Sequence, residues 1–465
     1  MGGISRRSVA RLSVGAGLGV AAASFASCGG PGGRDGAPGS PDERRAVRLI
    51  GDGSTSYTGR QPHQPASSLP LEPGQTPPQF VVFSWDGAGE LGMGLFPRFL
   101  ELARTHGAHM TFFLSGLYLL PEHKKRLYDP PNNPVGASDI GYLTDEHLKA
   151  TLKYVREAWL DGHEIGTHFN GHFCTGSGSV ANWSAEQWRS EIEQARTFVK
   201  SWRTHTGWHD EPSLPFDYDK ELVGGRTPCL LGQSNLLPAA REVGWRYDAS
   251  SPGGLQRWPR KQGGIWDLPL QSIPFPGHTF EVLSMDYNML ANQSKTTTRA
   301  PSYNYPYWRA QATQAYLAGF QRAYETNRAP LFIGNHFEQW NGGIYMDAAE
   351  ETLRQIAGRE DVRLVSFRQF VDWLDAQEPE SLAKLRSLQV GEKPEGGWTA
   401  FLRPAERARD RAGAAGRRTE MHRTAIPPER RLTVPQSRPL STDWTLSGAD
   451  RPSWRGWHVT RWNHR

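Results

Sequence analysis

Two histidines four residues apart, His168 and His172, follow a short apolar, strand-like approach and end in a glycine-bearing loop. Side chains at positions i and i+4 share a face on a strand and on a helix, so both imidazoles can point at one ion. Neutral imidazole nitrogens suit zinc, which catalytic sites hold with about three protein ligands and an open position for water. The pair predicts a metal site, although two ordinary polar histidines at the end of a strand would show the same spacing.

Four other segments carry residues that can bind a metal, transfer a proton or orient a charge. Each follows a short apolar or strand-like stretch between residues 80 and 375, and the residues are Asp86, Arg226, Asp248 and His336. Taken alone, each of them is a weak signal, because strands commonly end in such residues where a loop begins. Together with the histidine pair, their order along the chain matches the motif order of a known family.

The segment from Gly162 to His172 resembles the second motif of the polysaccharide deacetylase family, the carbohydrate esterases that share the NodB homology domain. The segments around Asp86, Arg226, Asp248 and His336 are similar to the family's other four motifs, in the same order. The resemblance implies a divalent metal, zinc in the first instance, held by Asp86, His168 and His172. It also implies a metal-dependent hydrolase that removes N-acetyl groups from an envelope or extracellular polysaccharide such as peptidoglycan.

The first motif departs from the family pattern. The family has two adjacent acids there, a general base followed by a metal ligand, whereas this chain has Ser84, Trp85, Asp86 and Gly87. In one register Asp86 is the metal ligand and Trp85 replaces the base. In the other, Asp86 is the base, Gly87 takes the ligand position and Glu90 is a substitute ligand. A shift of one residue sends every side chain of a strand to its other face. We favour Asp86 at the metal, since two histidines alone bind a divalent ion poorly.

The remaining motif residues have implied roles in the same reaction. His336 would protonate the leaving amine, because an imidazole can carry a proton near neutral pH and release it. Arg226 and Asp248 look like the family's supporting pair, in which a carboxylate held by arginine raises the pKa of the histidine. A backbone N–H near Thr227 or Cys229 could stabilise the oxyanion.

Aromatic rings suit a sugar ligand, because their flat faces pack on the apolar faces of sugar rings. Trp85, Trp266 and Trp340 lie in or beside the motif loops, and together with Pro228 they are the predicted substrate-binding residues. Two other functions stay open on the sequence. One is an O-acetyl esterase at the same site, and the other is a glycan-binding lipoprotein whose degenerate site does not hydrolyse.

The two ends of the chain have compositions unlike the middle. Residues 1–28 read as a signal peptide with paired arginines and a lipobox, which predicts a lipid on Cys28 and a place on the outer face of the cytoplasmic membrane, or secretion. Residues 29–79 are rich in Gly, Pro and Ser and predict a disordered tether. Residues 381–465 predict a basic, disordered tail. In an exported protein, Cys174 and Cys229 are then a disulfide candidate.

Residues 80–380 alternate short apolar runs with helical patterns, which favours an α/β fold with a parallel sheet. Ser184 and Gln187 predict a capping box at the start of one helix, and Ala312, Tyr316 and Phe320 have the apolar spacing of another. The family resemblance implies a distorted, incomplete (β/α) barrel of about seven parallel strands, with the chemistry at the carboxyl ends of the strands. The formal net charge is only +5 and the ends of the chain are rich in arginine, so the middle is near neutral and nucleic-acid binding is not expected. We expect a monomer.

Overall fold

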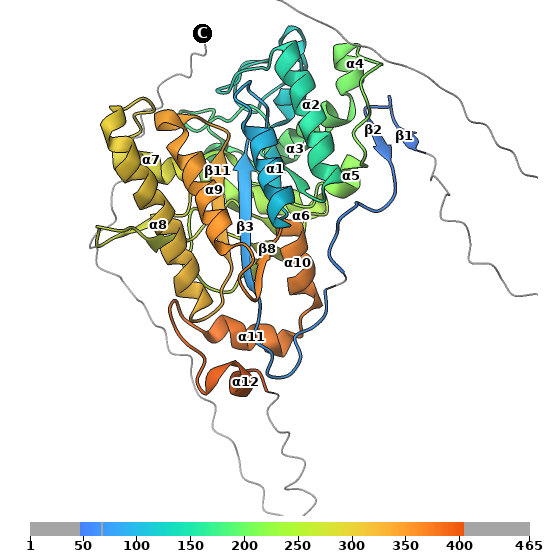
Figure 1. Cartoon of the computed structure of the whole chain (residues 1–465). Coiled ribbons are helices and arrows are strands. Elements are labelled where there is room, and N and C mark those ends of the chain that lie inside the picture. Colours follow the sequence, from blue (N-terminus) through green and yellow to red (C-terminus); the bar gives the residue numbers. More distant parts are fainter. Residues whose placement is uncertain (1–46, 67, 404–465) are drawn as a thin grey trace, which may run out of the picture. The chain divides into compact units, whose positions relative to one another are not determined.

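In the computed structural model, which describes residues 47–66 and 68–403, a parallel sheet forms the centre of the fold. Its middle strand is β3 (Gln79–Asp86), in which every residue is buried. The order is β11 (Leu331–His336), β3, β4 (Thr111–Leu114) and β5 (Glu164–Thr167), and β12 (Val362–Leu364) pairs with the start of β3. Figure 1 shows β3 in the middle of the view, with helices on both sides of it.

The two faces of β3 bury different residues, because side chains alternate along a strand. Val81, Phe83 and Trp85 belong to a core shared with the surrounding helices. Phe80 and Val82 point the other way into a second core, and Asp86 lies on this same face. The direction of Asp86 is thereby fixed by the packing of the whole strand.

The helices connect and cover the strands. In chain order they are α1 (Leu95–His106), α2 (Asp145–Leu160), α3 (Ala185–Lys200), α4 (Trp202–Thr206), α5 (Tyr218–Glu221), α6 (Gln233–Glu242), α7 (Asp286–Ser294), α8 (Tyr305–Tyr324), α9 (Ile344–Ile356), α10 (Phe367–Ala376), α11 (Pro379–Ser387) and α12 (Gly397–Phe401). Ser184 and Gln187 form a reciprocal capping box that begins α3. This confirms the cap that the sequence predicts at that position.

Short strands fill the other half of the fold. They are β6 (Tyr247–Asp248), β7 (Arg260–Gln262) and β8 (Ile265–Asp267) in one sheet and β9 (Ser272–Pro274) and β10 (Glu281–Leu283) in another. Backbone hydrogen bonds link this half of the fold to the main sheet, among them Arg226 N–H to Thr167 O at one side and Gly334 N–H to Ser284 O at the other. The α/β class and the parallel sheet are confirmed. The regular parallel sheet of the described residues has five strands, so the predicted barrel of seven strands is not confirmed.

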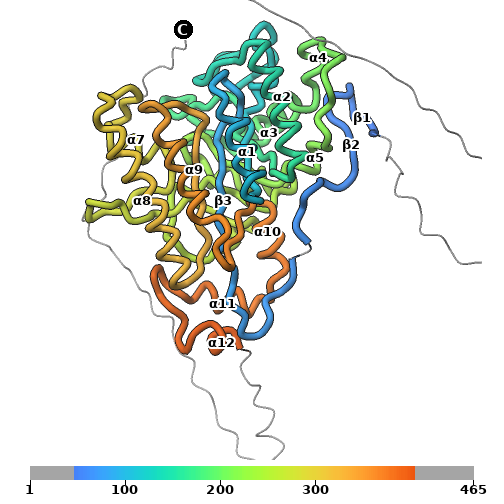
Figure 2. Tube along the Cα trace, viewed as in Figure 1, coloured from blue at the N-terminus to red at the C-terminus, as the bar shows by residue number. Residues whose placement is uncertain are grey.

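The segment before β3 is folded, which corrects part of the predicted tether. A hairpin, β1 (Arg48–Ile50) and β2 (Thr55–Tyr57), packs on the domain, where Trp202 Nε1 donates to Ser54 O at 2.8 Å. The backbone around residues 71–74 runs beside α11 and α12, as Figure 2 shows, and a Cβ on Gly74 would lie 3.0 Å from Thr399 O. Residues 381–403 therefore belong to the domain and not to a disordered tail. Buried Leu385 and Leu402 anchor them in the second core.

Several predictions about the ends of the chain lie outside the described residues. These are the signal peptide, the lipid on Cys28, residues 29–46 of the tether and the basic tail from residue 404. Among the helices of residues 47–403 that the structure describes, none is long and apolar enough to cross a membrane.

Candidate active site

The five motif segments meet at the carboxyl edge of the parallel sheet. His336 and Asp86 are register partners at the ends of β11 and β3. His168 directly follows β5, whose last residue, Thr167, forms a parallel bridge with the glycine before Arg226. Parallel strands present their carboxyl ends at one edge, so residues far apart in the sequence come together there.

Asp86 forms a buried ion pair with Arg226. The Arg226 Nη1 donates to Asp86 Oδ1 at 2.8 Å, and both side chains are almost fully buried. The same nitrogen donates to Ser84 Oγ at 2.9 Å, while Arg226 Nε donates to Ala249 O. Burial alone would raise the pKa of Asp86, but the charge of Arg226, helped by His168 and His336, holds it below its ordinary value. Asp86 is thus a carboxylate throughout the neutral range.

His336 forms a second acid–base pair with Asp286, the first residue of α7. The Asp286 carboxylate accepts from the His336 backbone N–H at 2.7 Å and lies 2.8 Å from Nδ1 of the ring. Burial would lower the pKa of His336, but Asp286, with a contribution from Asp86, raises it to about 9. The ring is therefore protonated at neutral pH, and about a quarter of its side chain stays exposed to solvent.

His168 and His172 stand side by side as neutral imidazoles. Their ring centroids are 5.1 Å apart, and burial lowers the pKa of His168 to about 4 and that of His172 to about 3. His168 Nδ1 is 2.8 Å from Arg226 O, so this nitrogen carries the hydrogen and Nε2 keeps its lone pair. Among the described residues, the buried Nε2 has no hydrogen-bond partner. In metal-binding histidines, one ring nitrogen binds the metal and the other typically donates a hydrogen bond to a backbone carbonyl or a carboxylate.

The donor atoms of the predicted ligand set, Asp86, His168 and His172, do not all lie within 4.8 Å of one another, although the charge of Asp86 acts on both rings. Within the described residues, the group of three such donors that approach within 4.8 Å of one another is His172, Cys174 and Cys229. Asp86 is directed to Arg226, because packing of Trp85 on the opposite face of β3 sets the strand register. The two histidines fit a metal, and with Asp86 Oδ1 bound to Arg226 the choice between a ligand role and a base role for Asp86 stays a prediction.

Glu90 does not replace the missing ligand. Its carboxylate oxygens accept hydrogen bonds from the backbone N–H groups of Gly94 and Phe96, at the start of α1. These bonds satisfy donors that have no partner within the helix, so the carboxylate has a structural task away from the histidines.

Asp248 is placed differently from the prediction. It accepts from Ser250 Oγ at 2.6 Å and from Gln233 Nε2 at 2.7 Å, and it forms no ion pair with Arg226. Burial raises its pKa to about 6. The Ser250 hydroxyl also accepts from the Thr227 N–H, which removes that N–H as an oxyanion donor. Asp286, which the sequence analysis missed, takes the position beside histidine that we assigned to Asp248.

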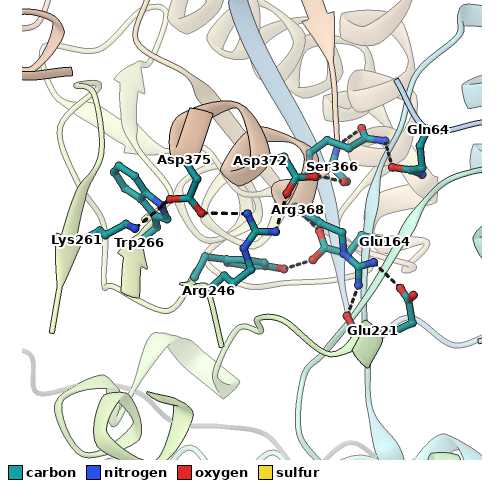
Figure 3. Close-up of polar contacts among 12 residues, drawn as sticks. Gln64, Glu164, Glu221, Arg246, Lys261, Trp266, Ser366, Arg368, Asp372 and Asp375 are labelled. Atoms are coloured by element: carbon teal, nitrogen blue, oxygen red, sulfur yellow. Dashed lines mark hydrogen bonds and ion pairs between the residues drawn. The ribbon is translucent and has the colours of Figure 1, made fainter. Parts of the chain in front are cut away.

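Three tryptophans and a proline were predicted to bind substrate, and the structure separates them. Trp85 is fully buried between Phe99, Phe112 and Phe337, so it is a core residue. Trp266 is also buried, with its N–H on Asp375 (Figure 3), and Lys261 and Arg386 lie over its ring. Neither ring is free for a sugar, and both predictions are wrong.

Trp340 and Pro228 do lie by the site. The ring centroids of Trp340 and His336 are 5.3 Å apart. Pro228 begins the turn η4 (Pro228–Leu230), directly after the loop that carries Arg226. Their contact with substrate stays a prediction.

A disulfide joins the two loops that flank the site, as the sequence predicts. Cys174 and Cys229 are bonded, with their Cα atoms 6.0 Å apart. His172 and Arg226 are therefore carried by loops that are covalently linked.

Comparisons with known proteins give distant structural matches. No family model and no curated protein matches the chain. Similar solved structures include a protein assigned as a polysaccharide deacetylase from Mycobacterium smegmatis, with 14% identity, 67% of this chain and 95% of that chain covered, and a TM-score of 0.39. A CE4 esterase from Streptococcus mutans has 14% identity, coverages of 62% and 86%, and a TM-score of 0.34. A polysaccharide deacetylase from Bacillus cereus has 13% identity, coverages of 62% and 92%, and a TM-score of 0.33. Similarity at this level carries no functional argument, so function rests on the residues of the site.

Proposed function

We propose that this protein is a metal-dependent hydrolase that removes N-acetyl groups from an envelope or extracellular polysaccharide. The observation that carries the proposal is the pair formed by Asp86 and His336 at neighbouring strand ends, one group ionised as an anion and the other as a cation at neutral pH. A base and an acid are the two groups that hydrolysis of an amide requires.

The two groups have distinct tasks in this reaction. Asp86, held by Arg226, takes the proton from the attacking water. His336, held and charged by Asp286, gives its proton to the nitrogen that leaves. An amine is a poor leaving group unless it is protonated, and a histidine with a pKa of about 9 arrives at that step with its proton in place. This favours an N-acetyl over an O-acetyl substrate.

His168 and His172 are the residues that would hold zinc or another divalent metal. When bound, such a metal polarises the acetyl carbonyl and lowers the pKa of a bound water from 15.7 toward about 7. Support for this assignment comes from the lone pair of His168 Nε2 and from the low pKa values that keep both rings neutral.

A polysaccharide-binding protein without turnover is the second candidate. It is favoured by the missing carboxylate ligand, since Gly87 follows Asp86 and Glu90 caps α1. Such a protein would retain affinity for the glycan and release no acetate.

Acetate release from N-acetylglucosamine polymers distinguishes the two candidates. We expect release by the purified protein, loss of release with a chelator and recovery with zinc. Glycan binding with no acetate release from any acetylated polymer would support the second candidate and overturn the first.

A further inference from the structure

The disulfide beside the site is surrounded by donors that suit a metal ion once it is open. The donor atoms of His172, Cys174 and Cys229 lie within 4.8 Å of one another. Cys174 Sγ is 3.5 Å from His172 Nδ1, so this ring nitrogen faces the sulfur atoms. Two thiolates and an imidazole form a ligand set typical of zinc and other thiophilic ions.

The backbone already holds the two cysteines at a suitable distance. Two thiolates bound at about 2.3 Å to one tetrahedral zinc have sulfur atoms roughly 4 Å apart. The two sulfur atoms of the reduced disulfide would therefore have to separate only a little to bind one ion. Contacts other than the disulfide fix both loops. Ser179 Oγ donates to Cys174 O at 3.1 Å, and the Leu230 N–H donates to Thr227 O.

Both loops also contain unusual backbone conformations. Phe169 and His172 have φ of 60°, and Cys229 and Leu230 have φ of 56°. Non-glycine residues rarely adopt this left-handed region, and such residues gather at functional sites where the surroundings hold them in place. The geometry around the sulfurs is therefore a property of the folded loops and should outlast the disulfide.

A reductant has access to the disulfide from one side. Cys229 is exposed and Cys174 is partly buried. Exposed disulfides are the more readily reduced ones.

We propose that reduction of the Cys174–Cys229 disulfide creates a metal site formed by both thiolates and His172. An external dithiol gives two electrons and two protons to the disulfide and becomes a cyclic disulfide. The two protein thiols then release their protons to solvent as they bind a divalent ion together with the lone pair of His172 Nδ1. This site does not rest on the proposed hydrolase function, although it shares His172 with the proposed zinc pair.

Cadmium binding tests the site without any measurement of activity. The background is the full chain with Cys28→Ser, which leaves Cys174 and Cys229 as its thiol-forming residues. One sample is reduced with dithiothreitol and freed of it under anaerobic conditions, and the other stays oxidised. Both are titrated with Cd²⁺ while the thiolate-to-metal charge-transfer absorption and the circular dichroism are recorded.

We expect the charge-transfer band to saturate at one thiolate-bound Cd²⁺ per reduced chain, and we expect no such band in the oxidised chain. Cys174→Ser or Cys229→Ser should abolish tight binding, and His172→Ala should weaken it by at least about tenfold. His209→Ala removes an exposed histidine elsewhere and is the matched control, with no change. Absence of binding in the reduced chain, loss of the fold on reduction, or equal affinity in His172→Ala would each overturn the proposal.

Discussion

Asp86 and His336 carry opposite charges because each has its own buried partner. Arg226 stabilises the anion of Asp86, and Asp286 stabilises the cation of His336. The two pairs then stabilise each other, since Asp86 and His336 are register partners at adjacent strand ends. Separate partners for acid and base are what allow both to be ready at one pH.

Titration of His336 tests this division of charge. NMR of the ring should give a pKa of about 9, and Asp286→Asn should lower that pKa, because burial then acts without the main counter-charge while Asp86 and Glu338 remain. The raised pKa stabilises the folded protein fully below about pH 6.5, and this stabilisation is lost as the pH rises through 9. A pKa unchanged in Asp286→Asn would contradict the assignment.

Gly87 occupies the position where the family resemblance places a metal-binding acid. Gly87 has φ of +62°, which aspartate tolerates better than most residues, and a Cβ there would have only ordinary contacts of 3.6 Å and beyond. We predict that Gly87→Asp tightens zinc binding by at least about tenfold, since even outer-shell changes alter metal affinity by about 10–100-fold.

Calorimetry with Zn²⁺ measures the effect, and Gly94→Asp is the matched control. Gly94 is also left-handed, with φ of +66°, and has open space around its Cβ position. Equal zinc affinity in Gly87→Asp and in the parent protein would show that position 87 does not face the histidine pair.

At the scale of single residues, the sequence was informative about positions and less so about partners. It predicted His168, His172, Arg226 and His336 at one edge, and the structure brings them there. It assigned Asp248 to the position of Asp286, because Asp248 ends a short strand-like run whereas Asp286 begins a helix. The residues next to each acid in the sequence do not show which of the two acids contacts His336 in the folded protein.

At the scale of elements, a largely buried ionic network attaches α10 to the sheet. Arg368 pairs with Glu221 at 2.6 Å, and its backbone N–H donates to the buried Glu164 at 2.8 Å (Figure 3). Glu164 also accepts from Thr111 and Tyr247. We predict that Arg368→Ala lowers the free energy of unfolding by about 3–5 kcal/mol, because it leaves the buried Glu164 and the partly buried Glu221 without their counter-charge.

Arg246 provides the matched control for this prediction. It pairs with Asp372 and Asp375 on the same helix, but its side chain is about a third exposed. Its replacement by alanine should cost no more than about 1 kcal/mol in urea denaturation. Equal losses in the two variants would show that burial of the Arg368 network contributes nothing special.

Elements with a strong local signal were predictable. The capping box and apolar spacing of α3 and the spacing of Ala312, Tyr316 and Phe320 in α8 occur as expected. The half of the fold with the short strands β6 to β10 was not predictable, because single bridges such as that between Met285 and Gly334 leave no periodic pattern in the sequence. The burial of Trp85 was not predictable either, because the face of the sheet to which this side chain points depends on the register of β3.

At the scale of the whole molecule, the segment before β3 contributes to stability. Ser56 N–H donates to Leu214 O at 2.9 Å, and Gln61 Nε2 donates to Trp159 O and His163 O. We predict that a chain without residues 1–46 unfolds at the same urea concentration as the full chain. Loss of residues 1–66 should cost at least about 3 kcal/mol, given about 1 kcal/mol for each hydrogen bond.

An unchanged unfolding midpoint after removal of residues 1–66 would restore the tether interpretation. Composition suggested that interpretation, because residues 29–79 have few apolar side chains. The segment folds by using backbone groups and a few polar side chains against a core formed elsewhere, and composition alone does not reveal such docking.

The central claim is that Asp86 and His336 act as base and acid in acetyl hydrolysis. The most direct measurement is the initial rate of acetate release from N-acetylglucosamine oligomers by the parent protein, Asp86→Asn and His336→Gln, with Asp372→Asn as a surface control. We predict a loss of at least about 100-fold in each site variant and none in the control. Release by Asp86→Asn or His336→Gln at the parent rate would contradict the claim.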